Sequence, residues 1–150
     1  MPLAIIRALL NIKKAAAQAN LELNQIDEAK GKLIIEAIDQ LLALPDDDLR
    51  KDFPLKVYQT GSGTQTNMNT NEVVANLAKR LNPDVTVLPN DDVNKGQSSN
   101  DVYPTAMNIV AVEALDQLLP AVQHLIDELK AKQEQYWHVV KVGRTHLQDA

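Results

Sequence analysis

The sequence predicts a mainly α-helical fold with one short β-like segment near 139–142. Apolar residues make up 45% of the chain but aromatic residues only 3%, so the core must be built from Leu, Ile, Val and Ala packed in helices. Apolar residues also recur at three- and four-residue spacings, as they do on one face of a helix. Except for Gly31, the glycines lie in three short polar segments, which indicates loops on a helical scaffold.

The first two helices are expected over residues 1–20 and about 27–44. The first has no polar residue before it that could cap it, and its apolar side contains Leu3, Ile6, Leu10 and Lys13. Pro45 ends the second helix. The acidic run 46–48 is interpreted as a solvated turn.

A third helix is expected from Glu72 to about Arg80, closed by Asn82 and Pro83. The segment before it, 57–71, contains no charged residue, which is unusual for an exposed loop.

The longest helical pattern covers about 104–136. Its apolar residues follow a spacing close to a heptad repeat: Met107, Ala111, Ala114, Leu118, Val122, Leu125 and Leu129. Such a face fits either a bundle within the chain or an interface between subunits. Pro120 removes one hydrogen bond and should kink or restart the helix.

The composition argues against several classes of protein. A net charge of −5 and the lack of a Lys/Arg cluster argue against nucleic acid as a partner. No apolar run approaches the roughly 20 residues of a membrane span, and the first residues do not form a signal peptide. Without cysteine the chain has no disulfide and no thiolate metal site, which is compatible with the cytoplasm.

The three glycine-led polar segments begin at Gly61, Gly96 and Gly143 and are rich in hydroxyl, amide or imidazole groups. Glycine lets backbone N–H groups turn toward a ligand, and hydroxyls and amides add neutral donors. Three such segments suggest loops that bind a small anion. The first segment lacks the lysine of a phosphate-binding P-loop, and by itself it fits a surface turn better than a binding loop.

The other candidate motifs leave alternatives open. Residues 90–94 form a polar turn that lacks the glycine and the glutamate of a calcium-binding EF-hand loop. Residues 98–101 fit either a helix cap or a site for a ligand carboxylate. His146, in a glycine-led segment, is the best candidate for a general acid or base, whereas His124 and His138 are interpreted as structural. No His/Glu pair has the spacing of a metal site.

Taken together, three strings resemble class II fumarase of the aspartase/fumarase superfamily: GSGTQTNMNTNE at 61–72, PNDDVNKGQSSND at 89–101 and GRTHLQDA at 143–150. Aspartases tend to show Gly-Ala-Gly-Thr-Ser and Ser-Thr-Asn where this chain has 61–65 and 98–100. The resemblance therefore favours fumarase. A part of an aspartate ammonia-lyase-like enzyme and a non-catalytic helical assembly module are the alternatives.

The resemblance implies reversible hydration of fumarate to L-malate in the citric acid cycle, with no cofactor and no metal. The proton removed is a weakly acidic C–H, and neutral donors would stabilise the resulting aci-carboxylate. By resemblance His146 is catalytic, and the residues that bind the substrate are Ser62, Gly63, Thr64, Ser98, Ser99, Asn100 and Thr145. The implied partners are fumarate or L-malate and further copies of the chain in a homotetramer, with neither nucleic acid nor membrane, in the cytoplasm or, for a eukaryotic parent, the mitochondrion.

Two departures from the family pattern matter. Leu88 stands where fumarases usually have a histidine, which places in doubt a secondary carboxylate site that includes Asn90 and Asp91. The later Gly-Ser-Ser-x-Met-Pro-x-Lys-x-Asn loop, which carries the base in the family pattern, does not occur in these 150 residues. The expectation is therefore a self-associating but inactive amino-terminal portion: a helical domain over 1–100 and the first long helix of a central bundle within 101–150.

Overall fold

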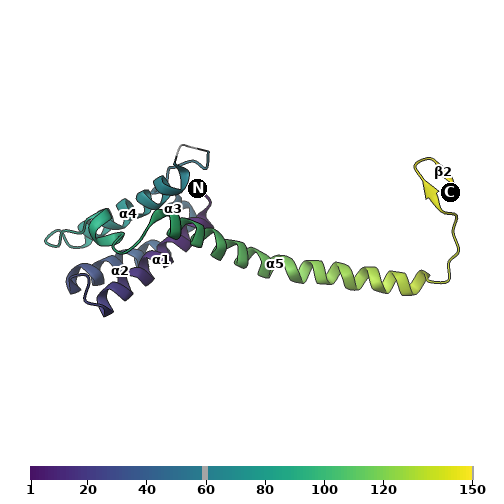
Figure 1. Ribbon diagram of the computed structural model, residues 1–150, viewed down its shortest axis with the longest axis horizontal. Helices are drawn as coiled ribbons and strands as arrows, with labels where there is room; N and C mark the ends of the chain where they lie inside the picture. Colours follow the sequence, from purple (N-terminus) through teal and green to yellow (C-terminus); the bar gives the residue numbers. More distant parts are fainter. Residues whose placement is uncertain (59–60, 150) are drawn as a thin grey trace. The chain divides into compact units, whose positions relative to one another are not determined.

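The computed structural model describes residues 1–58 and 61–149; the side chains of Ser62, Thr145 and Asp149 lie outside that description. The chain is mainly helical, as predicted (Figure 1). Its elements are helices α1 (Leu3–Glu22), α2 (Glu28–Ala43), α3 (Asp46–Lys51) and α4 (Ser62–Leu81), the π-helical turn η1 (Pro89–Val93), the long helix α5 (Ser99–Tyr136), and strands β1 (Arg144–Thr145) and β2 (Gln148–Asp149).

The chain divides into two compact units, Met1–Ala111 and Val112–Ala150, and each is described by itself. In the first unit α1 packs on α2, and α2 packs on α4 (Figure 1). In the second unit β1 and β2 pair antiparallel, with Arg144 opposite Asp149 and Thr145 opposite Gln148. The expected domain division after residue 100 stays a prediction.

Aliphatic side chains from α1, α2 and α4 form the main core of the first unit. Its fully buried members include Ile6, Leu10, Ile34, Ile38, Val74 and Ala78. A second cluster joins α1 to the start of α5 through Ile5, Leu9, Val102 and Ala106. The core is therefore built mainly from aliphatic side chains that recur on one face of each helix, as the sequence predicts.

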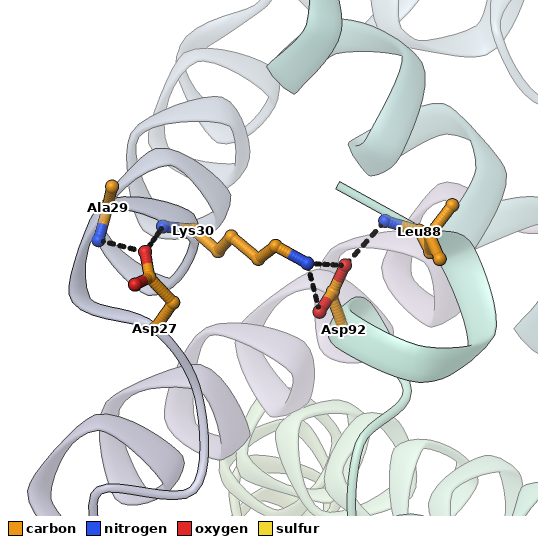
Figure 2. A network of polar contacts seen from close by, with 5 residues as sticks. All are labelled: Asp27, Ala29, Lys30, Leu88 and Asp92. Carbon is orange, nitrogen blue, oxygen red and sulfur yellow. Dashed lines mark hydrogen bonds and ion pairs between the residues drawn. The ribbon is translucent and has the colours of Figure 1, made fainter. Parts of the chain in front are cut away.

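Polar contacts fix η1 to α2. Asp27 caps α2 by accepting hydrogen bonds from the backbone N–H groups of Ala29 and Lys30, at 2.9 and 3.3 Å. The Lys30 ammonium then donates to both carboxylate oxygens of Asp92, each at 3.0 Å. Asp92 also accepts a 2.7 Å hydrogen bond from the backbone N–H of Leu88 (Figure 2). This pair connects the loop that carries the second polar segment to the helical core.

One helix was not expected, and another begins earlier than expected. The acidic run 46–48 is not a turn but the first turn of α3, where carboxylates stabilise the partial positive charge of the helix N-terminus. Helix α4 begins at Ser62 rather than near Glu72. The uncharged stretch before Glu72 is explained by burial, because the helix face formed by Thr66, Asn67, Thr70 and Asn71 is at most 1% exposed.

Three expectations for the region after residue 98 are wrong in whole or in part. Helix α5 begins at Ser99 rather than Pro104, because Ser98 caps it. The helix also continues through Pro120 without the restart that was one of the two expected outcomes; the kink stays a prediction. Residues 139–142 form no strand, because their exposed valines have no strand beside them to pack on; the strands are β1 and β2 instead.

By length and composition alone, α5 is the one helix in the described part of the chain that could cross a membrane. Core helices of globular proteins can be equally long and apolar, so this property alone is weak evidence for a membrane span.

Candidate functional site

The amino-terminal ends of α4 and α5 meet at one open pocket of about 520 Å³. Its lining residues, which define the α4/α5 pocket, are Gly61, Gly63, Thr64, Ser99, Asn100, Tyr103 and Pro104. The structure thus brings Gly63 and Thr64 of the first polar segment next to Ser99 and Asn100 of the second. These four residues were selected from the sequence as candidates for binding a small anion.

Two glycines, Gly61 and Gly63, shape the first turn of α4 at this pocket. Gly61 precedes α4 with φ 65° and ψ 35°, a left-handed conformation that favours glycine. Its carbonyl accepts a 2.7 Å hydrogen bond from the backbone N–H of Gln65. Gly63 lies against the ring of Tyr103, where an added Cβ would be 3.1 Å from Cδ1. The backbone of α4 can therefore approach α5 closely at the pocket.

The start of α5 uses Ser98 as its cap. The Ser98 carbonyl accepts from the N–H groups of Asp101 and Val102 at 3.1 and 2.9 Å. The Ser98 hydroxyl oxygen accepts from the N–H of Asn100 at 3.3 Å. Capping, one of the two interpretations left open for this segment, is thus observed at Ser98, whereas Ser99 and Asn100 line the pocket.

The α4/α5 pocket has the properties of an anion site. The first N–H groups of a helix have no partner within the helix, and the aligned peptide dipoles place partial positive charge there. Two such ends at one pocket, with hydroxyls and an amide between them, can hold a carboxylate without a cation in the lining.

Behind the pocket lies a buried polar network that the sequence analysis missed. The Lys13 ammonium, fully buried, donates to Asn94 Oδ1 at 2.7 Å and to Gln97 Oε1 at 2.8 Å. Asn67 Nδ2 donates to Asn94 Oδ1 at 3.1 Å and to Ser99 Oγ at 2.9 Å. Burial lowers the pKa of Lys13 to about 8, because loss of water disfavours the charged form.

Two asparagines on the buried face of α4 carry an unsatisfied oxygen. The Oδ1 atoms of Asn67 and Asn71 are buried, and neither has a hydrogen-bond partner among the described residues. The sequence held two signals for this network: Lys13 at an apolar position of the first helix, and the uncharged segment before Glu72. Neither identified its partners, because these are distant in the sequence.

The residues of the doubtful secondary site lie at η1. Leu88, Asn90 and Asp91 are all exposed. The neighbouring Asp92, by contrast, is nearly buried: its side chain is 10% exposed and forms an ion pair with Lys30. Leu88 supplies a backbone N–H to Asp92 and has no polar side chain to offer a ligand.

The third polar segment belongs to the second unit. Thr145 lies in β1, and its side chain is outside the described part. His146 is exposed in the turn between β1 and β2 and has φ 51°, an uncommon value for a non-glycine residue. His124 and His138 are exposed in the same unit. Within the described ranges no group of three or more His, Asp or Glu side chains could hold a metal ion.

Comparisons with known proteins agree with the helical architecture. Residues 3–150 match the lyase family. The chain is 56% identical to the class II fumarate hydratase of Myxococcus xanthus and 49% identical to that of Bacillus subtilis, with all of this chain and 33% of each relative covered. A crystal structure titled fumarate lyase:delta crystallin, from Brucella melitensis, superposes with a TM-score of 0.79 at 43% identity, covering 98% of this chain and 35% of that one. The chain therefore spans about a third of the length of the relatives it matches.

Proposed function

Because the chain belongs to the lyase family and its resemblance to class II fumarase is confirmed, we propose that it forms part of a fumarate hydratase. The reaction is the reversible addition of water to fumarate, giving L-malate, as in the citric acid cycle. The observation that carries the proposal is the α4/α5 pocket, where two helix N-termini meet beside Thr64, Ser99 and Asn100.

The chemistry of the reaction suits such a pocket. Removing the C–H proton next to a carboxylate of malate places additional negative charge on that carboxylate. Donors already aimed at this position stabilise the charge as it develops, and they need no reorganisation. In the proposal Ser62, Gly63, Thr64, Ser98, Ser99, Asn100 and Thr145 bind the substrate carboxylates, and the reaction uses neither metal nor organic cofactor.

His146 is proposed to hold the reacting water or to transfer a proton. An imidazole can donate a hydrogen bond from one ring nitrogen and accept one at the other, which suits both purposes. The base expected from the resemblance lies on a loop that is not among these 150 residues, so the chain alone is expected to be inactive. The secondary carboxylate site at Asn90 and Asp91 is expected to be weak, since Leu88 cannot donate a side-chain hydrogen bond.

The proposed assembly is a homotetramer in the cytoplasm, with no nucleic acid or membrane partner. Its support is the apolar surface of the second unit, where exposed side chains follow the length of α5: Val112, Leu115, Leu118, Leu119, Val122, Leu125, Ile126 and Leu129. A surface of this kind is usually covered by another subunit. The same surface favours a second candidate function, a helical assembly module without catalysis.

A hybrid enzyme tests the proposed function. The matching third of the Myxococcus xanthus hydratase is replaced by this chain, and L-malate dehydration is followed by the absorbance of fumarate. Turnover is expected, with a large loss on Thr64→Ala, Asn100→Ala or His146→Asn and little change on Lys14→Met, a variant of an α1 residue that pairs with Asp39. A hybrid that assembles as a tetramer but does not turn over L-malate contradicts the proposal and favours the assembly module.

A further inference from the structure

The buried network behind the α4/α5 pocket connects Lys13 on α1 with Asn94, which follows η1, Asn67 on α4 and Ser99 on α5. Lys13 Nζ and Asn67 Nδ2 both donate to Asn94 Oδ1, and Asn67 Nδ2 also donates to Ser99 Oγ; this assignment of donors and acceptors is the direction of the network. These four residues define the Lys13 relay. Its three hydrogen bonds are 2.7, 3.1 and 2.9 Å long, so all of them are within the usual range for an N–H donor and an oxygen acceptor.

Two contacts orient the Asn94 amide: Asn94 Nδ2 donates to the Gln97 backbone carbonyl at 3.2 Å, and the Lys13 ammonium donates to Asn94 Oδ1 with the charged and shorter hydrogen bond, at 2.7 Å. An ammonium group has three N–H donors and no acceptor, whereas an asparagine side chain can present either its oxygen or its NH₂ group. Lys13 therefore requires the oxygen of Asn94 on its side. The same oxygen accepts a hydrogen bond from the NH₂ group of Asn67. Lys13 also donates to Gln97 Oε1, so the Gln97 amide likewise presents its oxygen to the ammonium.

The consequence reaches the pocket at Ser99. Because Asn67 Nδ2 donates to Ser99 Oγ, the Ser99 oxygen acts as an acceptor inside the network, and its single O–H is left to donate elsewhere. With Asn67 reversed, Ser99 would donate inward and would present a lone pair to the pocket. A lone pair repels a carboxylate, whereas an O–H binds it.

The unsatisfied oxygen of Asn67 supports this direction. Reversal would exchange Oδ1 and Nδ2 and would give that buried oxygen the Ser99 hydroxyl as a donor. The observed orientation leaves Oδ1 without a partner, so a stronger preference elsewhere must hold it. The charged donor at the other end of the relay supplies that preference, since hydrogen bonds from charged groups are stronger than neutral ones.

We propose that Lys13 is a positioning residue: through Asn94 and Asn67 it orients the Ser99 hydroxyl as a donor to an anion in the α4/α5 pocket. The anion is a carboxylate of the substrate, so this part of the inference depends on the proposed function. The direction of the relay itself does not depend on it.

The direction is tested on the 150-residue chain without ligand, by NMR exchange of the Asn67 side-chain NH₂ protons with water. Lys13→Met, which has a similar length and no donor, should speed this exchange about tenfold or more, since one net hydrogen bond corresponds to about that factor. Lys14→Met, the matched control on the next residue of α1, should leave it unchanged. Unchanged exchange in folded Lys13→Met overturns the proposal.

A second measurement requires no variant. In the unmodified chain the Asn67 NH₂ protons should show nuclear Overhauser contacts to the β-protons of Ser99. An Asn67 amide reversed at this position contradicts the proposal even where Lys13→Met fails to fold.

The functional consequence is tested in the hybrid enzyme. Lys13→Met should raise KM for L-malate about tenfold, and it should raise KM much less when the hybrid already carries Ser99→Ala. An equal rise in KM with and without the Ser99→Ala substitution indicates a merely structural role and overturns the positioning. A hybrid without any turnover contradicts the proposed fumarate hydratase function instead. The NMR results then still decide the direction of the relay.

Discussion

Raising the pH should stabilise the first unit of this chain, because Lys13 is buried and no carboxylate in the described part of the chain pairs with it. Its ammonium donates to the amide oxygens of Asn94 and Gln97, and burial lowers its pKa from 10.5 to about 8. Each pKa unit corresponds to about 1.4 kcal/mol, so the charged form costs about 3 kcal/mol of the free energy of unfolding.

The sign follows from the two pKa values. Below about pH 8 Lys13 is protonated in both the folded and the unfolded chain, and the whole cost is present. Between about pH 8 and 10.5 the folded chain has released the proton while the unfolded chain still binds it, so stability rises with pH. Above 10.5 both states are neutral and the cost has disappeared.

Urea unfolding of the chain and of Lys13→Met at about pH 7 and about pH 10 measures the effect. The stability of the chain relative to Lys13→Met should increase by about 2 to 3 kcal/mol between the two pH values. Comparison with the variant removes the contribution of the other titrating groups, and Lys14→Met reports the effect of deleting one positive charge from α1. A difference that does not depend on pH refutes the account of Lys13.

Three further outcomes follow from the packing. Gly31→Ala should destabilise the chain by about 1–3 kcal/mol in urea unfolding, because the new Cβ would lie 2.5 Å from Leu21 Cγ and Cδ2. Alanine favours helices, so without this contact the variant would be more stable, and a more stable variant contradicts the prediction. Asp92→Ala should lower the free energy of unfolding by about 2 kcal/mol, because the Lys30 ammonium and the Leu88 N–H lose their acceptor (Figure 2). A change below about 0.5 kcal/mol in urea unfolding shows that the Lys30–Asp92 pair contributes little. Leu118→Asp with Leu125→Asp should abolish self-association in sedimentation, whereas Gln117→Asp on the same helix should not; association that survives the double variant excludes this face as the interface.

Local patterns predicted the helices well where one face is apolar. The first two helices lie within a few residues of their predicted limits. Asp27 marks the start of α2 as its N-cap, and Pro45 follows its end. The start of α4 was missed because its buried face is polar at Thr66, Asn67 and Thr70, and hydrophobic periodicity cannot detect such a face.

The candidate site was predictable in its residue types but not in its geometry. The glycine-led segments suggested loops that bind a small anion, and the resemblance to fumarase named Thr64, Ser99 and Asn100 within them. The fold brings these three residues to one pocket, and their role in binding stays a prediction. The Lys13 relay was not predictable, since its direction depends on contacts between residues up to 81 positions apart. An amide orientation is a property of the assembled network rather than of any local pattern.

The turnover of L-malate and L-aspartate by the hybrid enzyme tests the central claim most directly. The account predicts formation of fumarate from L-malate, none from L-aspartate, and a large loss of the malate activity on Asn100→Ala. An assembled hybrid that forms fumarate from L-aspartate but not from L-malate would contradict it.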